Sequence, residues 1–439
     1  MKMQSYKNEM VNTLLSFLAV DSVQGAPADG APFGTGTKEV LDRFLDLAAS
    51  FGMRTKNIDG YCGYAEIGEG ELLGIPVHLD TVPFGEDWTR SPLGEVAEEN
   101  GETRIYGRGA EDDKGPCVAV MYALKALLSE GRTPRRRIRV IAGLNEESGW
   151  KCIEHYLATE EIPSMSFSPD ADFPVIFCEK GVLHVRVTMK KPAGVLSFTG
   201  GERVNMVADR ATLEVTALSD AAFSKCLKGG IKVKFIDGGF RLSAEGVSAH
   251  GSTPDKGENA ILKILYAVKS TSEDLADLYD YFHMTDGSGL GLKLSDEVSG
   301  DLTLNVGKVE SSADDLTFSL DIRYPVSCTE DQILESLQGA LGEGAVVTVQ
   351  GRHLPLHVAK DSELVKSLTD AYNEVTGESA EPIAIGGATY ARAFPNAVAF
   401  GPVFPGEDSR IHQKDESISI TNFLKCAEIY RKALEKLAF

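Results

Sequence analysis

Residues 72–80 read LLGIPVHLD, a mostly apolar run that ends in His78 and Asp80. A short apolar run of this length predicts a buried strand. A helical pattern follows over residues 115–130 and stops at a glycine, and a second strand pattern covers residues 137–144. Alternating strands and helices predict an α/β layered domain, whose ligands gather beyond the carboxyl ends of the strands.

The pattern changes after residue 181, where strand pairs joined by short turns replace the strand–helix alternation. These predicted pairs are 232–236 with 240–244 and 302–310 with 316–325. Further predicted elements are helices at 150–157, from 362 and from 421, and a strand at 164–168. We therefore predict an inserted α+β domain over residues 182–355. Residues 1–181 and 356–439 would build the α/β domain together.

Length and composition limit the possible partners. A chain of 439 residues predicts two domains, and a formal net charge of -21 argues against a nucleic-acid or acidic-membrane partner. The seven cysteines are scattered without a CxxC pair, which predicts neither thiolate zinc nor a disulfide framework and favours the cytoplasm. Residues 11–20 have helical periodicity without a signal-peptide cleavage site, and no run reaches the length of a membrane span.

Acidic side chains gather near the predicted strand and helix ends. His78 and Asp80 project to the same face of a strand because they lie two residues apart. The acids 111–113 stand directly before a predicted helix, where carboxylates commonly cap the N-terminus. We interpret Asp113 as such a cap. Asp112 belongs to a run of acids whose mutual repulsion a cation would relieve.

Further ligand candidates follow two other strand patterns. Glu146 and Glu147 are adjacent, so one could bind a metal while the other holds a pKa suited to a general base. Either Asp170 or Asp172 could face the same crevice, and His412 lies before the last helix. Taken singly, each pattern also fits an ordinary loop or helix end. Two histidines and three carboxylates in one domain together fit a dinuclear zinc site.

Six motifs occur in a fixed order: HLDTVP (78–83), GRGAEDDKG (107–115), NEESG (145–149), PDADFP (169–174), SAHGSTP (248–254) and IHQKDE (411–416). This series resembles the dinuclear zinc peptidases related to carboxypeptidase G, aminoacylase and acetylornithine deacetylase. It is most similar to their bacterial dipeptidase V (PepV) branch. The resemblance implies a zinc-peptidase catalytic domain with a mixed sheet flanked by helices, and a ferredoxin-like lid domain at 182–355 that binds substrate.

The resemblance also implies a ligand set for two zinc ions, with manganese or cobalt as alternatives. His78 and Asp170 would hold one ion, Glu147 and His412 the other, and Asp112 would bridge both. The peptide bond before Asp113 is expected to be cis, as in similar proteins.

Catalytic and substrate-binding roles carry over in the same way. Asp80 would orient His78, Glu146 would be the general base, and His250 would reach the carbonyl oxygen of the substrate. The substrate-binding residues implied by the resemblance are Asn205, Arg323, Gly386 and Gly387. Arg323 is placed on the polar face of its strand and would bind the C-terminal carboxylate of a small peptide.

Asp170 discriminates within the family, because the deacylases and carboxypeptidases typically have glutamate there. The sequence thus favours a cytoplasmic dipeptidase, monomeric or homodimeric, acting on unblocked dipeptides. The alternatives are an N-acyl-amino-acid deacylase of the same family and an inactive binding protein. Two positions depart from the family pattern: Asp415 replaces the usual asparagine, and Glu111 replaces a residue that is small in many relatives.

Overall fold

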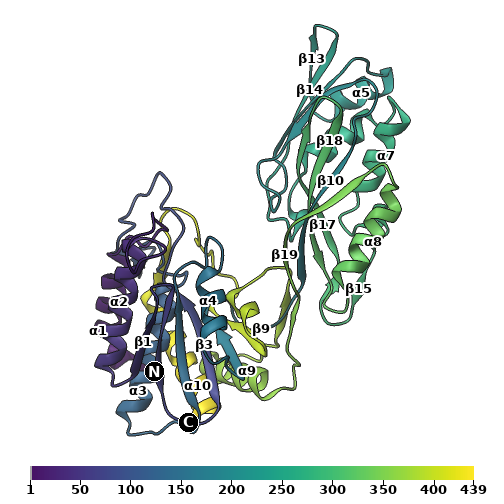
Figure 1. Ribbon diagram of the computed structural model, residues 1–439. Coiled ribbons are helices and arrows are strands. Elements are labelled where there is room, and N and C mark those ends of the chain that lie inside the picture. The colour runs from purple at the N-terminus through teal and green to yellow at the C-terminus, as the bar shows by residue number, and fades with distance from the viewer. Residues whose placement is uncertain (1) are drawn as a thin grey trace. The chain divides into compact units, whose positions relative to one another are not determined.

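The computed structural model describes residues 2–439, which form two compact units (Figure 1). The first unit comprises residues 2–177, 357–383 and 389–439, and the second comprises residues 178–356 and 384–388. The short segment 384–388 groups with the second unit, although it falls in the range that the sequence assigns to the first domain. Its backbone explains this, because the N–H of Lys180 donates to the carbonyl of Ile385 at 3.0 Å.

The first unit is built on a nine-stranded mixed sheet, as predicted. The strand order is β1 (Arg54–Ile58), β2 (Cys62–Ile67), β6 (Arg137–Gly143), β3 (Leu72–His78), β7 (Met165–Ser168), β22 (Ala397–Phe400), β9 (Val175–Glu179) and β20 (Leu356–His357), with β21 (Ile383–Ile385) beside β9. The three neighbours β6, β3 and β7 run parallel, and so do β7 and β22. The remaining pairings described for this sheet are antiparallel.

Strand β3 lies between β6 and β7, and all seven of its residues are buried. This explains the continuous apolar run, since a strand covered on both faces has no solvent-facing positions. Parallel strands end at the same edge of a sheet, so the loops after β3, β6 and β7 are neighbours. Those loops begin at His78, Gly143 and Ser168, and they carry most of the predicted metal ligands.

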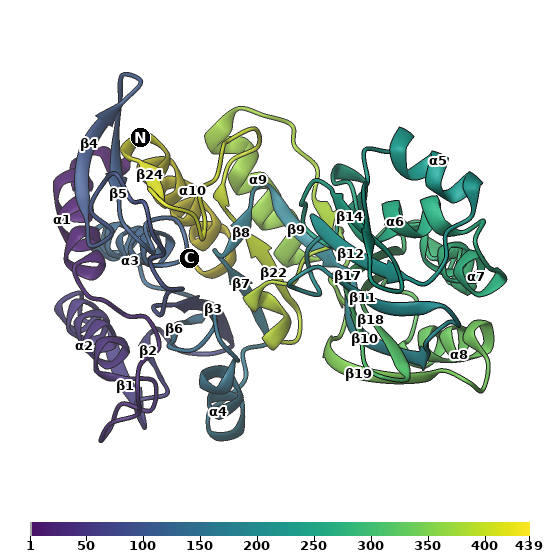
Figure 2. The ribbon, with the colours of Figure 1, turned by 90° about the horizontal axis from the view of Figure 1, so that it is seen from above.

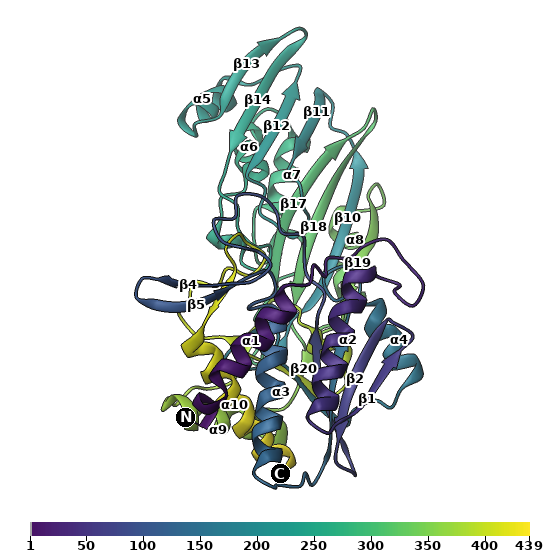
Figure 3. The ribbon, with the colours of Figure 1, turned by 90° about the vertical axis from the view of Figure 1, so that its left-hand side faces the viewer.

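Six α-helices accompany this sheet: α1 (Lys7–Leu18), α2 (Thr35–Ser50), α3 (Lys114–Ser129), α4 (Lys151–Thr159), α9 (Glu363–Thr376) and α10 (Ile420–Ala438). Helices α1, α3, α10 and α9 contact one another in this order, as Figure 3 shows for the first three. Helices α2 and α4 both contact β2. The helix predicted at 115–130 and the strand predicted at 137–144 are confirmed to within one residue at each end. The helix predicted at 11–20 begins earlier, at Lys7.

Three short strands form a separate sheet in the order β24 (Ser417–Ser419), β5 (Glu102–Tyr106) and β4 (Glu95–Glu99). A two-stranded sheet pairs β23 (Pro402–Val403) with β8 (Ala171–Asp172). Strand β24 directly follows the segment that carries His412, so its pairing with β5 ties this segment to residues 102–106.

The second unit is an eight-stranded antiparallel sheet covered by helices on one face (Figures 1 and 2). The strand order is β13 (Lys232–Ile236), β14 (Gly239–Glu245), β12 (Arg210–Val215), β11 (Val195–Gly200), β17 (Thr303–Ser311), β18 (Asp315–Tyr324), β10 (Gly181–Lys190) and β19 (Val346–His353). The helices are α5 (Asp220–Lys228), α6 (Ala260–Val268), α7 (Glu273–Phe282) and α8 (Glu330–Leu341), and a small hairpin pairs β15 (Ser295–Asp296) with β16 (Gly300–Asp301). Both predicted strand pairs are confirmed, as is the α+β class of this region.

The core of the second unit lies between the sheet and its helices. Phe318 of β18 is fully buried and contacts Phe198 of β11 and Phe282 of α7, with ring centroids 6.4 and 4.6 Å apart. Along the full described range, 2–439, no helix combines the length and the apolar character needed to cross a membrane.

Gly143 at the end of β6 offers a test of how tightly the sheet packs beneath the strand-end loops. A Cβ atom there would lie 2.1 Å from the hydroxyl oxygen of the fully buried Tyr390 and 3.1 Å from Cys152 Sγ. We expect Gly143→Ala to lower the free energy of unfolding by about 1–3 kcal/mol, because overpacking forces buried groups apart. The midpoint of thermal unfolding, followed by circular dichroism, measures this change.

Gly339→Ala is the matched control, since Gly339 lies in α8 and a Cβ atom there would have no neighbour within 4 Å. Alanine is the better helix former, so this variant should be as stable as the wild type or slightly more stable. Equal effects of the two substitutions would contradict the packing assigned to Gly143.

Candidate active site

His78 stands at the end of β3 with its imidazole fixed on both sides. Its Nδ1 lies 3.0 Å from the backbone oxygen of Asp80, and its Nε2 lies 2.8 Å from Asp112 Oδ1. A carbonyl oxygen can only accept, so Nδ1 donates to Asp80, and Nε2 donates its own proton to the Asp112 carboxylate. Burial would lower the pKa of His78, but its hydrogen bonds to Asp112 and Asp170 raise this pKa well above its usual value. Loss of the Nε2 proton gives a neutral ring that is protonated on Nδ1. This is the tautomer that binds a metal through Nε2.

Asp112 lies between two imidazoles. Its Oδ1 faces His78, and its Oδ2 lies 2.9 Å from Nε2 of His412. Burial alone would raise the pKa of Asp112, but the hydrogen bonds to His412 and His78 outweigh burial and hold the pKa well below its usual range. Each carboxylate oxygen therefore faces a different imidazole nitrogen, which is the arrangement that a carboxylate bridging two cations would need.

His412 completes the second side of this cluster. It is half-exposed, and its Nε2 lies 2.9 Å from Glu147 Oε1 as well as from Asp112. Burial would lower the pKa of His412, yet its hydrogen bonds to Asp112 and Glu147 raise it to about 10. A protonated imidazole thus supplies the positive charge that the two carboxylates require when no metal is bound.

One ligand atom each of His78, Asp112 and Glu147 lies within 4.8 Å of the others. Asp170 borders this group, with its Oδ1 3.8 Å from His78 Nε2. Burial, and then the charge of Asp112, raise the pKa of Asp170 to about 7. Several carboxylates in one buried space need a cation or protons for compensation, and imidazole with carboxylate oxygen suits zinc.

Asp80 fixes the loop after β6. Its carboxylate oxygens accept hydrogen bonds from the backbone N–H groups of Glu146 and Glu147, at 3.1 and 3.2 Å. The nearer contact to the ring of His78 is the backbone oxygen of Asp80, since its carboxylate lies 3.7 Å from Nδ1. Asp80 therefore orients the ring through its main chain and the two glutamates through its side chain.

Asp113 occupies the N-cap position of α3, as the sequence suggests, but its side chain does not cap the helix. It precedes α3, but its side chain makes no capping hydrogen bond, and Oδ2 instead accepts the backbone N–H of His78 at 3.1 Å. Burial, and then the charge of Asp170, raise the pKa of Asp113 well above its usual range. A neutral acid gains little from a helix dipole, so Asp113 is not the charged cap that the sequence suggests. The Asp112–Asp113 peptide bond is cis, which confirms that expectation.

Two buried residues that the sequence analysis did not single out support Asp112. Glu416 Oε1 accepts from the backbone N–H groups of Gly109, Glu111 and Asp112 at 3.0, 3.1 and 3.3 Å. Arg108 pairs with the other oxygen of Glu416 at 2.7 Å. Arg108 belongs to the same sequence motif as Asp112, and Glu416 to the same motif as His412. This closeness in sequence is the signal by which their role could have been predicted.

The two departures from the family pattern have contacts of their own. Asp415 accepts hydrogen bonds from the backbone N–H groups of Thr89 and Arg90 and from the Thr89 hydroxyl, at 2.8–3.0 Å. Glu111 is buried and accepts from the hydroxyl of Ser409 at 2.9 Å. Each acid therefore holds a neighbouring loop.

The predicted substrate-binding residues belong to the second unit. Arg323 is buried, whereas the alternating pattern of β18 suggests an exposed side chain. Its Nε and Nη2 donate hydrogen bonds to the carboxylate of Asp321 at 2.7 and 2.9 Å. Its Nη1 donates to the backbone oxygen of Gly386 at 3.0 Å. A Cβ on Gly386 would meet Ser252 Cβ at 3.2 Å, so this loop approaches its neighbour closely.

His250 and Asn205 lie on two paired segments of the same unit. The backbone of Met206 bridges to His250, and the N–H of Gly251 donates to the carbonyl of Asn205 at 2.8 Å. The imidazole Nδ1 of His250 lies 2.7 Å from the hydroxyl of Ser252. Burial, and then the nearby Arg323, lower the pKa of His250, so the ring is neutral at pH 7.

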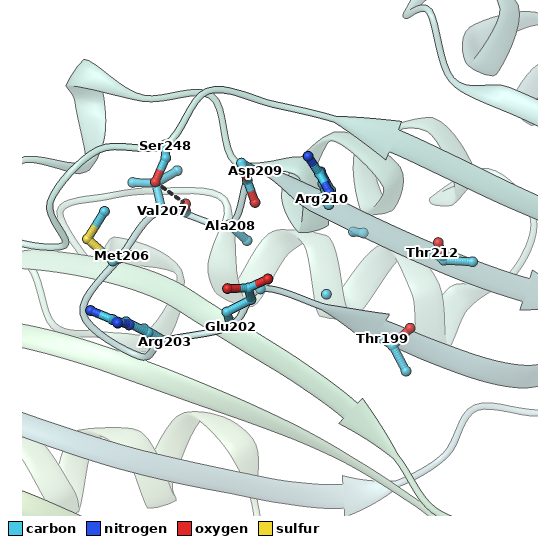
Figure 4. A pocket seen from close by; sticks show the side chains of 13 residues that line it. Thr199, Glu202, Arg203, Met206, Val207, Ala208, Asp209, Arg210, Thr212 and Ser248 are labelled. Atoms are coloured by element: carbon cyan, nitrogen blue, oxygen red, sulfur yellow. Dashed lines mark hydrogen bonds between the residues drawn. The ribbon is translucent and has the colours of Figure 1, made fainter. Parts of the chain in front are cut away.

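The segment that carries Asn205 also borders an open pocket of about 580 Å³ (Figure 4). Charged side chains of both signs line it, from Glu202, Arg203, Asp209 and Arg210. The hydroxyl of Ser248 donates to the backbone of Val207 at its rim, at 3.4 Å. Asn205 is thus presented on a loop that faces solvent on at least one side.

Comparisons with known proteins show the family to which the chain belongs. The family model described as "Peptidase family M20/M25/M40" matches residues 74–436. The putative dipeptidase YtjP of Bacillus subtilis is 37% identical over 98% of each chain. A putative dipeptidase of Staphylococcus epidermidis is 32% identical over 99% of this chain and 98% of its own.

Solved structures resemble the fold at low sequence identity. Human carnosine dipeptidase 1 aligns with a TM-score of 0.59 at 16% identity, covering 99% of this chain and 97% of its own. The aminoacylhistidine dipeptidase of Vibrio alginolyticus gives a TM-score of 0.59 at 14% identity, with 96% of each chain covered. On the family match and the two relatives above 30% identity, this chain belongs to peptidase family M20/M25/M40.

Proposed function

We propose that this protein is a metal-dependent dipeptidase that hydrolyses the peptide bond of unblocked dipeptides. The observation that carries the proposal is the carboxylate of Asp112, whose two oxygens face His78 and His412 at 2.8 and 2.9 Å. Relatives named as putative dipeptidases that match nearly the whole chain support the same activity.

The ligand set that the family resemblance implies is compatible with this geometry. His78 and Asp170 would hold one divalent cation, Glu147 and His412 the other, and Asp112 would bridge them. Zinc fits these imidazole and carboxylate donors best, with manganese or cobalt as alternatives. When bound, such ions supply Lewis-acid polarisation of the scissile carbonyl and activation of water.

Glu146 is the proposed general base. Its backbone is fixed by the Asp80 carboxylate, and burial followed by the charge of Asp170 raises its pKa well above the usual range. A carboxylate with a raised pKa can take a proton from the attacking water and deliver it to the leaving amine. Glu147, although adjacent, is engaged by His412 and has the ligand role instead.

The second unit would bind the substrate. Arg323 would receive the C-terminal carboxylate with Asn205 beside it, and the neutral ring of His250 would donate to the carbonyl oxygen. The backbone of Gly386 and Gly387 would approach the peptide closely, since neither has a side chain. Fixing the carboxylate at one end and the scissile bond at the other favours two residues over longer chains.

A reducing compartment such as the cytoplasm suits the chain. All seven cysteines are free thiols, and six of them are buried. Burial raises the pKa of the Cys62 thiol well above its usual value and that of Cys152 to about 11, so both are unreactive thiols at neutral pH.

Substrate specificity gives the direct test. After chelation and return of zinc or manganese, unblocked dipeptides should be hydrolysed faster than tripeptides or N-acyl amino acids, measured by release of free amino acids. Chelated protein should be inactive. Hydrolysis of N-acyl amino acids without dipeptides would assign the deacylase instead, and a metal-loaded protein inactive on the whole panel would favour a binding protein.

Loss of the proposed base should be severe. Glu146→Gln should lower kcat by about 1,000-fold, because it removes the proton acceptor while preserving shape. Glu154→Gln, an exposed glutamate of α4, is the matched control and should keep wild-type kcat. Wild-type activity in Glu146→Gln would refute the base assignment.

Arg323→Lys tests recognition of the carboxylate. Lysine retains a charge for the buried Asp321 but lacks the planar fork, so KM for dipeptides should rise about 10- to 100-fold with a smaller change in kcat. Arg186→Lys, on β10 and largely exposed, should leave both constants unchanged. An unchanged KM in Arg323→Lys would exclude this carboxylate contact.

Metal binding should release protons in a pH-dependent way. In the metal-free protein His412 has a pKa of about 10 and Asp170 of about 7, so both are protonated at low pH and must lose the proton to bind a cation. Asp170 loses its proton between about pH 6 and about pH 8 even without metal. Over this range the number of protons released per zinc ion bound should therefore fall by about one, and the affinity for zinc should rise.

Calorimetric titration with zinc in buffers of different ionisation enthalpy counts these protons. Asp170→Asn is the matched variant, since it should abolish the fall in proton number over this range. A constant proton number in the wild type would argue against Asp170 as a ligand.

A further inference from the structure

The side chain of Trp150 contacts the proposed general base. Its indole Nε1 donates a hydrogen bond to Glu146 Oε1 at 3.1 Å. An indole N–H is a donor only, so it stabilises the carboxylate oxygen and cannot itself take a proton. The contact occupies one oxygen of Glu146 and leaves Oε2 for the proton that the reaction moves.

The backbone of Trp150 adopts a conformation that is unusual for a bulky residue. Its φ is 63°, in the left-handed region where glycine is common and aromatic residues are rare. Asn145 stabilises this turn with two hydrogen bonds. Its backbone carbonyl accepts from the N–H of Trp150 at 2.8 Å, and its side-chain Oδ1 accepts from the N–H of Lys151 at 3.0 Å. The turn thus aims the indole back at a residue four positions earlier, outside any helix.

The ring of Trp150 is also supported from the protein interior. Tyr390 meets it edge to face with ring centroids 5.7 Å apart, and Tyr390 is fully buried. The hydroxyl of Tyr390 lies 3.3 Å from Sγ of Cys152, which belongs to the helix that begins directly after Trp150. The indole is therefore fixed by its own backbone and by the packing of Tyr390.

We propose that Trp150 is a positioning residue that holds the Glu146 carboxylate in the orientation required for proton transfer. The inference rests on the proposed role of Glu146 as base. Asp80 fixes the main chain of Glu146 and Trp150 fixes its carboxylate, so the two contacts together determine where Oε2 points. This role explains why a tryptophan occupies a left-handed backbone conformation in this turn. No smaller side chain combines a planar apolar ring with an N–H group that extends as far as Glu146.

Trp150→Phe removes the donor and retains an aromatic ring. We expect kcat on a good dipeptide substrate to fall about 10- to 100-fold, the usual effect of losing a hydrogen bond to a charged group, with KM changed by less than about threefold. Trp88→Phe is the matched control, because the only other tryptophan of the sequence also donates its N–H, to the backbone oxygen of Phe84 at 2.6 Å. It should keep kcat within about twofold of the wild type.

A second replacement separates the hydrogen bond from the packing. Site-specific incorporation of benzothienylalanine at position 150 replaces the indole N–H with sulfur at nearly constant shape. It should reproduce the loss in kcat while preserving the midpoint of thermal unfolding. If only Trp150→Phe lowers kcat and the isosteric analogue is fully active, the hydrogen bond has no positioning role and the inference is wrong.

Fluorescence provides a readout that needs no catalysis. In the Trp88→Phe background all tryptophan emission comes from Trp150, and Glu146→Ala should change its intensity or wavelength because the indole loses its partner. With Trp150→Phe, the emission of Trp88 should not respond to Glu146→Ala. Emission from Trp150 that is insensitive to Glu146→Ala would contradict the contact.

The outcomes distinguish this inference from the proposed function. Failure of the wild type to hydrolyse any dipeptide after metal return would count against the function, whereas the fluorescence arm would still test the contact. An active wild type and an inactive Glu146→Gln, together with wild-type kcat in Trp150→Phe, would overturn the positioning role alone. A raised KM at unchanged kcat in Trp150→Phe would also overturn it, by assigning Trp150 to the substrate.

Discussion

The carboxylate of Asp112, held between the imidazoles of His78 and His412, is the interaction around which the first unit is organised. It joins a residue at the end of β3 to one near the C-terminal helix, so distant parts of the chain must meet at one point. Glu416 secures it by accepting three backbone N–H groups of the loop at 109–112. Arg108 in turn donates a hydrogen bond to Glu416, and both are buried.

Such a concentration of acids is unfavourable without compensation, and the pKa pattern shows how the metal-free chain is compensated. Asp170 and Glu416 both have a pKa raised to about 7, in each case by burial and then by the charge of Asp112. His412 instead gains a proton, with a pKa of about 10. Each of these shifts lowers the negative charge of the site. A bound cation would do the same without protons, which explains why the fold tolerates the cluster.

The sequence predicts those parts of the structure that depend on local pattern. The apolar run at 72–80 becomes the buried strand β3, and the turn at 237–239 joins β13 and β14 as expected. The side-chain contacts of Asp113, Glu416 and Trp150 could not be predicted, because each partner is set by tertiary packing or by an unusual turn. The burial of Arg323 was missed for a similar reason, since strand alternation places Asp321 and Arg323 on the same face but does not reveal that both are buried there and paired with each other.

Hydrogen bonds separate the acids that would bind metal from those that hold the structure. Both oxygens of Asp80 accept backbone N–H groups, and Glu416 uses its two oxygens for backbone N–H groups and Arg108. Oxygens that accept such fixed N–H groups have fewer lone pairs left for a cation. The oxygens of Asp112 face imidazole nitrogens instead, and an imidazole nitrogen can exchange its proton for a metal. The partner of each oxygen, rather than the number of acids nearby, therefore supports the ligand role proposed for Asp112 and a supporting role for Asp80 and Glu416.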